Sequence, residues 1–438
     1  MIDYVVYASP EGGHVPPFVS WADAATNLQD AVDAVALPGG RVLAGDGVYD
    51  AGARVAAGQT VTNRLVLDKA VRVESVNGPA ATAIAGRWHS EETPLGALAI
   101  RGVYVANGAV LCGFTVSNGA TAAATYSDNG RGGGLFLAAG GAATNCTVTG
   151  CRAWVGGGAA GAAGVLRGCV LSGNAALSVG YTSGYGGGMH GLLAEGCAIV
   201  SNTAYIGGGA YECTLTGCDI LSNIADYQGG GAYYGVLDRC RVLGNRSGAP
   251  SYGVGGGVYD AVLTSCLISG NTSRQGGGVY GSTAAKGMYN CTVVANTATV
   301  TGTTQGGGGF YGNGTSYPVR NCIVYHNASG GLGTNLYQGA VTYTCSLPLP
   351  AGEGNMDAAP MIADFSNGRL LPGSPCAGAG LYEEWMAQAL DVEGEPRAGT
   401  GSVDMGADQL FVENLTGPLS VAIEGPAWPY FPGAPYSF

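Results

Sequence analysis

The stretch Gly207-Gly208-Gly209-Ala210-Tyr211, followed by Leu215-Thr216-Gly217-Cys218-Asp219-Ile220-Leu221-Ser222-Asn223, is the cleanest copy of a unit that decides the fold. Runs of at least three glycines occur eight times between Gly132 and Gly309. One cysteine recurs at the same place in each unit, at Cys146, Cys169, Cys197, Cys218, Cys240, Cys266, Cys291 and Cys322. From the second unit on, an asparagine stands five residues later, at Asn174, Asn202, Asn223, Asn245, Asn271, Asn296 and Asn327. Such self-similarity predicts a stacked array of coils.

Each unit is too short for two packed helices, because Cys197 and Cys218 are only 21 residues apart. The units are rich in Val, Ile, Leu, Thr, Tyr, Gly and Asn, which favour short strands and tight turns. Strands in register between coils, roughly 4.8 Å apart, would satisfy one another's backbone. We therefore predict an all-β solenoid, a parallel β-helix, with three short strands in each coil.

The alternation of side chains within a strand predicts which residues form the core. Cys218 and Ile220 lie two residues apart and should both point inward. Leu215 is also expected inward, which requires a bend between it and Cys218. We expect Asn223 to adopt a left-handed turn conformation and to hydrogen-bond its counterpart one coil away.

Composition restricts the class of partner. The chain has 438 residues, a formal net charge of −12 and only two lysines, Lys69 and Lys286, which argues against nucleic acid or an anionic membrane as partner. No run of 18 apolar residues predicts a membrane span, and the N-terminus lacks the pattern of a secretion signal. The sequence thus fits either a cytoplasmic protein or one whose signal has been removed.

Thirteen cysteines would suggest a disulfide scaffold, but eight of them occupy one repeating strand position. We interpret them as a ladder of free, buried thiols that act as small hydrophobes. Cys345 and Cys376, outside the ladder, are the pair expected to bond if any disulfide exists. No CxxC spacing occurs, so neither a zinc site nor another metal or cofactor is expected.

The sequence divides into four regions. Residues 1–118 should contain irregular first coils and an amphipathic helix over Trp21–Ala36, which would cover the open N-terminal end of the solenoid. Residues 119–345 carry the glycine, cysteine and asparagine repeats. Residues 346–410 contain several prolines and are expected to form loop-rich closing coils, and residues 411–438 resemble a linker rich in proline and aromatic residues.

These motifs resemble a known superfamily. The repeats are similar to the right-handed parallel β-helix repeats of the pectin-lyase-like superfamily, in particular those of large bacterial surface proteins. The run from Asn27 to Ala34, followed by Val42 to Tyr49, resembles that superfamily's cap helix and first coil. Residues 373–380, 391–397 and 403–408 look like the "choice-of-anchor Q" module of surface-anchored proteins. The resemblance implies a right-handed single-stranded fold and a secreted or cell-surface setting, but no particular chemistry, because the superfamily contains lyases, hydrolases and adhesins.

Candidate catalytic residues are few. Sugar-cleaving β-helices need paired carboxylates, or acidic calcium ligands beside a basic residue. The best cluster here is Glu195, Asp219, Asp238 and Arg241, together with Arg239. We favour interpreting it as cross-strand ion pairs, with Asp219 beneath Arg241, over catalysis. His190 and His326 each replace a residue of the repeat pattern, which indicates structural roles.

An aromatic residue follows most glycine runs, and the leading candidates for ligand contact are Tyr211, Tyr233, Tyr259, Tyr280 and Tyr311. If the apolar residue before each ring points inward, the rings form an outward row beside a flat strip of glycine backbone, where sugars or proteins could stack. An inward or purely self-stacked row is the alternative. Insertions at 178–185, 247–254 and 297–305 should project from one side and could wall a cleft.

Three functions remain open at this point, and one of them is a glycan-binding module that uses the tyrosines. The preferred one is a non-enzymatic extracellular scaffold, stalk or adhesin that contacts cell-surface glycans or other surface proteins along the seam of glycines and tyrosines. The alternative is a polysaccharide lyase or glycoside hydrolase. A groove that gathers three or more carboxylates, or a carboxylate pair with an arginine, would favour the enzyme.

Overall fold

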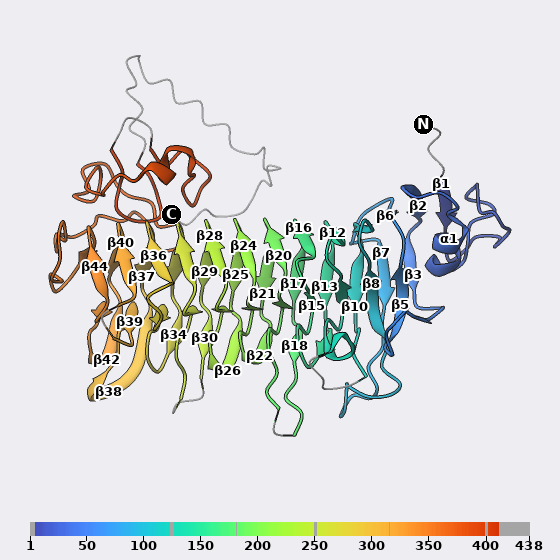
Figure 1. Cartoon of the computed structure of the whole chain (residues 1–438), viewed down its shortest axis with the longest axis horizontal. Coiled ribbons are helices and arrows are strands. Elements are labelled where there is room, and N and C mark those ends of the chain that lie inside the picture. The colour runs from blue at the N-terminus through green and yellow to red at the C-terminus, as the bar shows by residue number, and fades with distance from the viewer. Residues whose placement is uncertain are drawn as a thin grey trace, which may run out of the picture.

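The structure, a computed structural model, describes residues 5–122, 127–180, 182–248, 252–314, 316–398 and 402–410. Four sheets run side by side along an elongated solenoid (Figure 1). Every pairing between named strands is parallel except that of β4 (Arg54–Val55) with β5 (Thr62–Leu67), which is antiparallel. The chain is a parallel β-helix, as the repeat predicted, and it is right-handed, as the resemblance implied. The predicted tail, 411–438, lies outside the described residues.

The four sheets are numbered here by the order in which the chain first enters them. Sheet 1 contains β1 Val5–Ala8, β2 Gly40–Ala44, β6 Val71–Ser75, β9 Val110–Cys112, β12 Ala142–Thr144, β16 Val165–Arg167, β20 Leu193–Glu195, β24 Thr214–Thr216, β28 Val236–Asp238, β32 Val262–Thr264, β36 Gly287–Tyr289, β40 Pro318–Arg320 and β44 Ala340–Thr342. Sheet 2 contains β3 Gly47–Tyr49, β7 Thr82–Ala85, β10 Thr115–Ser117, β13 Thr147–Thr149, β17 Val170–Ser172, β21 Ala198–Val200, β25 Asp219–Leu221, β29 Arg241–Leu243, β33 Leu267–Ser269, β37 Thr292–Val294, β41 Ile323–Tyr325 and β45 Cys345–Ser346.

Sheet 3 contains β4, β5, β8 Arg101–Val105, β11 Leu135–Leu137, β15 Ala159–Gly161, β19 Met189–His190, β23 Ala210–Tyr211, β27 Ala232–Tyr233, β31 Val258–Tyr259, β35 Val279–Gly281, β39 Phe310–Gly312 and β43 Leu336–Tyr337. Sheet 4 contains β14 Arg152–Ala153, β18 Ala175–Ala176, β22 Thr203–Ile206, β26 Ile224–Gln228, β30 Arg246–Ser247, β34 Thr272–Ser273, β38 Thr297–Gln305 and β42 Ala328–Leu332. The helices are α1 Leu28–Ala34 and two 3₁₀ turns, Asp128–Gly130 and Glu384–Gln388.

A coil of the repeat region contains four strands, not the predicted three. The chain passes from β23 in sheet 3 to β24, β25 and then β26 in sheet 4, before it enters the next coil at β27. Sheet 4 begins only at β14, so the earlier coils lack this fourth side. The extra strand follows the repeat asparagine and takes up the variable part of the unit, where the predicted insertions enter.

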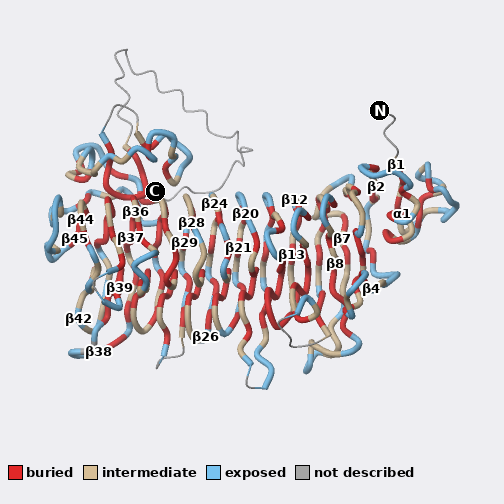
Figure 2. The backbone as a smooth tube through the Cα atoms, in the orientation of Figure 1, coloured by how far each residue is buried: buried red, intermediate tan, exposed pale blue. Residues whose placement is uncertain are grey.

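The core runs along the axis of the solenoid, as the buried segments in Figure 2 show. Leu215, Cys218 and Ile220 are each at most 1% exposed, so their predicted inward orientation is confirmed. Gly217 has a φ of 57° and supplies the expected bend between Leu215 and Cys218.

All thirteen cysteines are free, including Cys345 and Cys376, which lie unbonded in one buried cluster. In the ladder, the backbone N–H of Cys266 donates to the Sγ of Cys291 at 3.4 Å. Burial raises the pKa of the Cys266 thiol, so it stays protonated and unreactive.

The repeat asparagines form a second buried ladder, as predicted. Asn245 Oδ1 accepts hydrogen bonds from the backbone N–H of Asn223 at 2.8 Å and from its Nδ2 at 3.0 Å. The left-handed residue is not the asparagine but the one before it, which has a φ of 54° at Ser222 and 53° at His326. The bend therefore precedes the ladder and turns the asparagine side chain inward, where it can reach the next coil.

The glycine runs are buried, and the prediction that they form a flat outer strip is wrong. Gly207 has a φ of 67°, which favours glycine. A Cβ on Gly209 would lie 2.5 Å from the carbonyl oxygen of Gly231 and 3.0 Å from the side chain of Asn223. Glycine is required at these positions because the asparagine ladder and the backbone of the adjacent coil occupy the space that a side chain would need.

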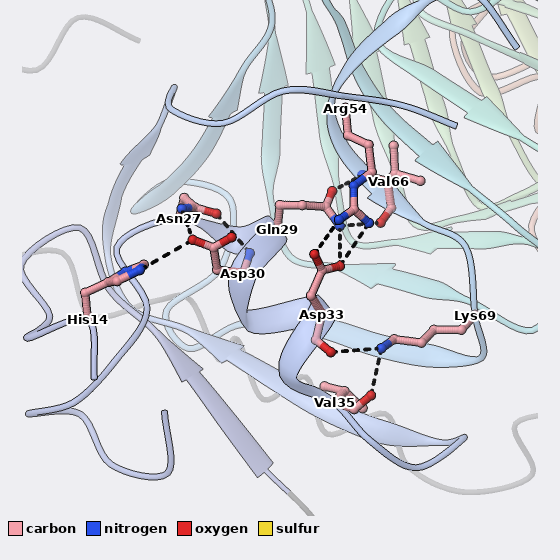
Figure 3. A network of polar contacts seen from close by, with 9 residues as sticks. All are labelled: His14, Asn27, Gln29, Asp30, Asp33, Val35, Arg54, Val66 and Lys69. Carbon is pink, nitrogen blue, oxygen red and sulfur yellow. Dashed lines mark hydrogen bonds and ion pairs between the residues drawn. The ribbon is translucent and has the colours of Figure 1, made fainter. Parts of the chain in front are cut away.

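The N-terminal helix is shorter than predicted and begins after Asn27, not at Trp21 (Figure 3). Ala25 is engaged in a parallel bridge with Ala8 of β1, which holds the preceding segment out of helical conformation. The Asn27 side chain then caps the helix by accepting from the N–H of Asp30 at 2.9 Å.

Helix α1 lies at the N-terminal end of the solenoid, as a cap should (Figures 1 and 3). Its buried Gln29 exchanges two hydrogen bonds with the backbone of Val66 in β5, at 2.9 and 3.2 Å. Asp33 forms an ion pair with Arg54, and Lys69 donates to the carbonyl of Val35 at 2.7 Å. The helix is thereby fixed to the first coils by side chains that satisfy backbone groups at the end of the stack.

The C-terminal region differs from the predicted closing coils. After β45, residues 347–398 and 402–410 form only turns, isolated bridges and one 3₁₀ turn, and they fold back over the outer face of sheet 2 (Figure 1). The N–H of Ala407 donates to Thr292 Oγ1 at 2.8 Å, and Asn321 exchanges two hydrogen bonds of 2.8 Å with the backbone of Leu381. This segment is called the C-terminal flap below.

The asparagine ladder should be a major source of stability. Replacing Asn245 by alanine leaves the N–H and amide of Asn223 without their buried acceptor, and removes the donor to the carbonyl of Ile220. We expect the free energy of unfolding to fall by about 3 kcal/mol, measured by urea denaturation. The matched change at the exposed Asn313 should alter it by less than about 0.5 kcal/mol. Equal losses at both positions would contradict a stabilising role for the ladder.

Candidate functional site

The predicted acidic cluster is split between two sheets. In sheet 2, Asp219 and Arg241 are register partners on β25 and β29, and the guanidinium donates to both carboxylate oxygens at 2.8 and 3.1 Å. The bond to Asp219 raises the pKa of Arg241. This is the cross-strand ion pair that we favoured over a catalytic arrangement.

Glu195 and Asp238 lie in sheet 1, with Thr216 of β24 between them in register. Two strand spacings, roughly 10 Å, therefore separate their backbones. Glu195 pairs with Arg167 at 2.8 Å, and Asp238 pairs with its neighbour Arg239 at 3.1 Å. The four candidate residues do not converge on one point, so they do not form a carboxylate pair around a shared substrate bond.

A polar pocket of about 490 Å³ nevertheless opens where sheets 1 and 2 meet. Of the predicted residues, Asp219, Arg239 and Arg241 line it, whereas Glu195 and Asp238 do not. Its other wall belongs to the C-terminal flap, through Asn367, Arg369, Val392, Glu393 and Glu395. No described residue of the predicted insertions lines it, and the strands of sheet 4, where these insertions enter, lie on the lower side of the view in Figure 1, opposite the C-terminal flap.

The charges of this pocket are largely paired. Arg369 donates to Glu393 at 2.7 and 2.9 Å, and this contact raises the pKa of the arginine. Asp219 is held by Arg241 in the same way. The pocket gathers the carboxylates Asp219, Glu393 and Glu395 beside arginines, and it offers many hydrogen-bonding groups with little net charge.

Sequence reasoning missed the flap residues of this pocket. Arg369 and Asp219 are 150 residues apart, and the flap carries no repeat from which its register could be inferred. The signals were the series of prolines after Cys345, which indicated a loop-rich region, and the 391–397 motif of the anchor-module resemblance, which contains Val392, Glu393 and Glu395 but did not place them beside sheet 2.

The predicted tyrosines form an outward row on sheet 3. The residues before them are buried, with Ala210 at 2% exposure and Val258 and Val279 at 0%. The rings stack face to face, with centroids 4.9 Å apart for Tyr211 and Tyr233 and 5.0 Å apart for Tyr259 and Tyr280. The interplanar angles within these pairs are 12° and 6°. The row is therefore both outward and self-stacked.

Self-stacking restricts what the row can bind. Each internal ring has a neighbour on both faces, so a sugar cannot stack on it and only the ring edges and hydroxyls remain. Burial raises the pKa of Tyr233, Tyr259, Tyr280 and Tyr311, which keeps these hydroxyls protonated as donors. Tyr311 already donates to Gln305 Oε1 at 2.8 Å.

The aromatic ladder extends beyond the predicted five tyrosines. His190 stacks on Tyr211 at 5.2 Å, and Tyr337 stacks on Tyr311 at 5.3 Å. Tyr104 and Phe136 form a separate stacked pair at 5.7 Å, because Ala160 occupies the register position between Phe136 and His190. Tyr104 and Tyr337 could have been found only from the register, since no glycine triplet precedes them.

A second pocket, of about 480 Å³, adjoins this ladder at the corner of sheets 3 and 1. Glu212, Tyr234 and Lys286 line it, and the Lys286 ammonium lies 5.8 Å from the Tyr234 ring centroid. Asp260 also lines it but is fully buried, where it accepts the N–H groups of Ser282 and Thr283 at 2.8 and 3.0 Å. Asp260 thus holds a loop in place, and Glu212 is the accessible carboxylate of this corner.

Neither a metal-binding cluster nor a membrane-spanning helix occurs in the part of the chain that the structure describes. No three His, Cys, Asp or Glu side chains are grouped so that they could hold a metal ion. No helix in that part of the chain is long and apolar enough to cross a membrane.

His190 should make the folded state acid-sensitive. Burial, with a smaller contribution from Arg131, lowers its pKa to about 4. The unfolded chain, with a histidine pKa of roughly 6.5, binds more protons than the folded protein between pH 6.5 and 4. The free energy of unfolding therefore decreases as the pH is lowered through that range. Urea unfolding should show that wild type loses about 2 kcal/mol more than His190→Phe between pH 7 and pH 5. The control Tyr211→Phe also places phenylalanine in the ladder and should keep the wild-type pH dependence. If His190→Phe and Tyr211→Phe reduced the loss of stability between pH 7 and pH 5 equally, the assignment to His190 would be refuted.

No model of a protein family matches the chain, and no curated protein matches its sequence. Among solved structures, the chain is similar to the pectate lyase Pel9A, with a TM-score of 0.46 and 14% identity over 93% of this chain and 96% of that one. It is similar to a rhamnogalacturonan lyase with a TM-score of 0.36 and 15% identity, over 78% and 87% of the two chains. For the GH136 lacto-N-biosidase from Eubacterium ramulus the TM-score is 0.36 and the identity 11%, over 77% and 68%. At these values the likenesses say nothing about the side chains of a site.

Proposed function

We propose that this protein is a non-enzymatic extracellular β-helix that serves as a surface scaffold, stalk or adhesin. The observation that carries the proposal is the continuity of the internal ladders. Asparagines link every coil from Asn174 to Asn327 to the next by side-chain hydrogen bonds. A rod stiffened from within and regular on its outside suits a protein that spans distance and presents a surface.

The outward charges support the same function. Asp219, Glu195 and Glu393 each face an arginine, so each carboxylate is occupied by an ion pair. A general acid or base must lie within hydrogen-bond reach of the substrate atom with which it exchanges a proton, and these carboxylates contact a guanidinium group instead. We further propose that the flap is the anchor-like module suggested by the sequence resemblance, and that other surface proteins or glycans are the partners.

Glycan contact is proposed at the hydroxyl edges of the tyrosine row. Tyrosine hydroxyls are protonated at neutral pH and can donate to sugar oxygens, and the adjoining corner with Glu212 and Lys286 adds an acceptor and a cation. Sugars are recognised by such convergent polar groups together with aromatic surface.

The alternative, a polysaccharide lyase or glycoside hydrolase, is favoured by one observation. The pocket beneath the flap gathers Asp219, Glu393 and Glu395 with three arginines. Glu395 forms no ion pair with a described residue, so it would be the carboxylate best able to exchange a proton.

A panel of polysaccharides separates the two functions. We expect no turnover by the purified protein, monitored as new reducing ends and as absorbance of unsaturated products. Turnover that is lost in Asp219→Asn or Glu395→Gln, and kept in the matched change Asp238→Asn outside the pocket, would establish the enzyme and overturn our proposal.

Glycan binding has its own test in the same preparation. Replacing Tyr211, Tyr233 and Tyr259 together by phenylalanine removes three hydroxyls but keeps the stacked rings, so thermal stability should be nearly unchanged. Binding signals on a glycan array should fall at least roughly tenfold, because each hydrogen bond between neutral groups contributes about 1 kcal/mol. Tyr252→Phe, at a residue 71% exposed and outside the row, should leave them intact. Undiminished binding by the triple variant would exclude the tyrosine edges as the contact.

A further inference from the structure

A pocket of about 510 Å³ lies at the corner of sheets 2 and 4, apart from both pockets described above. Arg246 of β30 and Arg274, just after β34, line it together with Ser247, Thr272 and Thr299. In the register of sheet 4, Arg246 faces Thr272, and Arg274 lies two residues farther along the next coil. The two arginine backbones are therefore roughly 8 Å apart, and both side chains can reach one bound group.

Neither arginine has an acidic partner among the described residues. Ile224 and Thr272 are the register partners of Arg246 on either side. The nearest carboxylate is Asp226, which lies one coil from Arg246 and two residues farther along, roughly 8 Å between backbones, and forms no ion pair with either arginine among the described residues. The neighbouring strand β38, Thr297–Gln305, contains no Asp or Glu.

Arginines of the solenoid are satisfied in two ways: Arg64, Arg87 and Arg152 donate to backbone carbonyls, and others form ion pairs. Arg167, Arg241 and Arg369 each donate to a carboxylate at 2.6 to 2.8 Å. In a chain of net charge −12, two neighbouring unpaired arginines form an isolated positive spot. Their mutual repulsion opposes folding unless an anion neutralises it.

A buried hydroxyl at the same pocket is also without a partner. Ser247 is 2% exposed, and its Oγ has no hydrogen-bond partner among the described residues. Ser247 follows the exposed Arg246 in β30, so its side chain points to the inner face of the strand and not toward a ligand beside Arg246. The donors that the pocket offers are therefore the two guanidinium groups.

We propose that this pocket binds a tetrahedral oxyanion, a sulfate or phosphate group. Guanidinium groups donate two parallel hydrogen bonds to such oxygens, and donors that approach from two coils suit a group whose oxygens point in several directions. The group can be a free anion or an ester carried on a larger ligand, which would lie along sheet 4. This site is independent of the glycan contact proposed at the tyrosine row.

Calorimetric titration with sodium sulfate and sodium phosphate, against sodium chloride at equal ionic strength, tests the site. Wild type should bind both oxyanions in preference to chloride. The affinity should fall at least roughly tenfold in Arg246→Gln/Arg274→Gln, because charge-assisted hydrogen bonds are lost. Arg167→Gln, at an ion-paired arginine of sheet 1, should bind like wild type, and near-UV circular dichroism should verify that the variants are folded.

A second titration distinguishes the source of the oxyanion. If a sulfated hexasaccharide binds more tightly than free sulfate, and the double variant loses this gain in affinity, the ligand is an ester on a saccharide. If the hexasaccharide and free sulfate bind with equal affinity, the ligand is the free ion. No preference for oxyanions over chloride, or equal oxyanion affinity in wild type and the double variant, would overturn the site. Binding of the desulfated hexasaccharide in both proteins would report the proposed glycan contact instead.

Discussion

The structure depends on one constraint: each coil must repeat the backbone register of the coil before it. The repeat asparagines enforce that register from the inside, because the Oδ1 of Asn245 accepts from both the backbone and the side chain of Asn223. A slip by one residue would bury the ladder's amides without partners, at a cost of several hydrogen bonds. The fixed five residues between Cys218 and Asn223 follow from this requirement, since the core strand and the ladder must remain in phase.

Once the register is fixed, like residues stack on like, and the properties of each column follow. Thiols accept from the N–H of the preceding cysteine, as at Cys266 and Cys291, and tyrosine rings lie about one strand spacing apart, which is also a good stacking distance. The same geometry that makes the tyrosine row regular occupies its ring faces. Regularity therefore stabilises the rod and at the same time limits which ligands its aromatic side can accept.

What could be predicted from the sequence was whatever the repeat itself encodes. The inward positions of Leu215, Cys218 and Ile220 and the asparagine contact all follow from spacing within one unit. The glycine triplets were misplaced on the surface, because a sequence shows that a side chain is missing but not that Asn223 and a neighbouring carbonyl fill its space. The pocket between Arg241 and Arg369 was beyond prediction, since it depends on a non-repeating flap that folds back across sheet 2.

In a solenoid, an outward residue has neighbours one strand spacing above and below it, so a charge is readily matched within its own column. Arg241 over Asp219 and Arg167 beside Glu195 follow that pattern and need no ligand to explain them. Departures from the pattern are therefore more informative than conspicuous clusters of charge. By this criterion we interpret the paired carboxylates that first drew attention as structural, whereas Arg246 and Arg274, which no motif singled out, line a pocket without an ion-pair partner among the described residues.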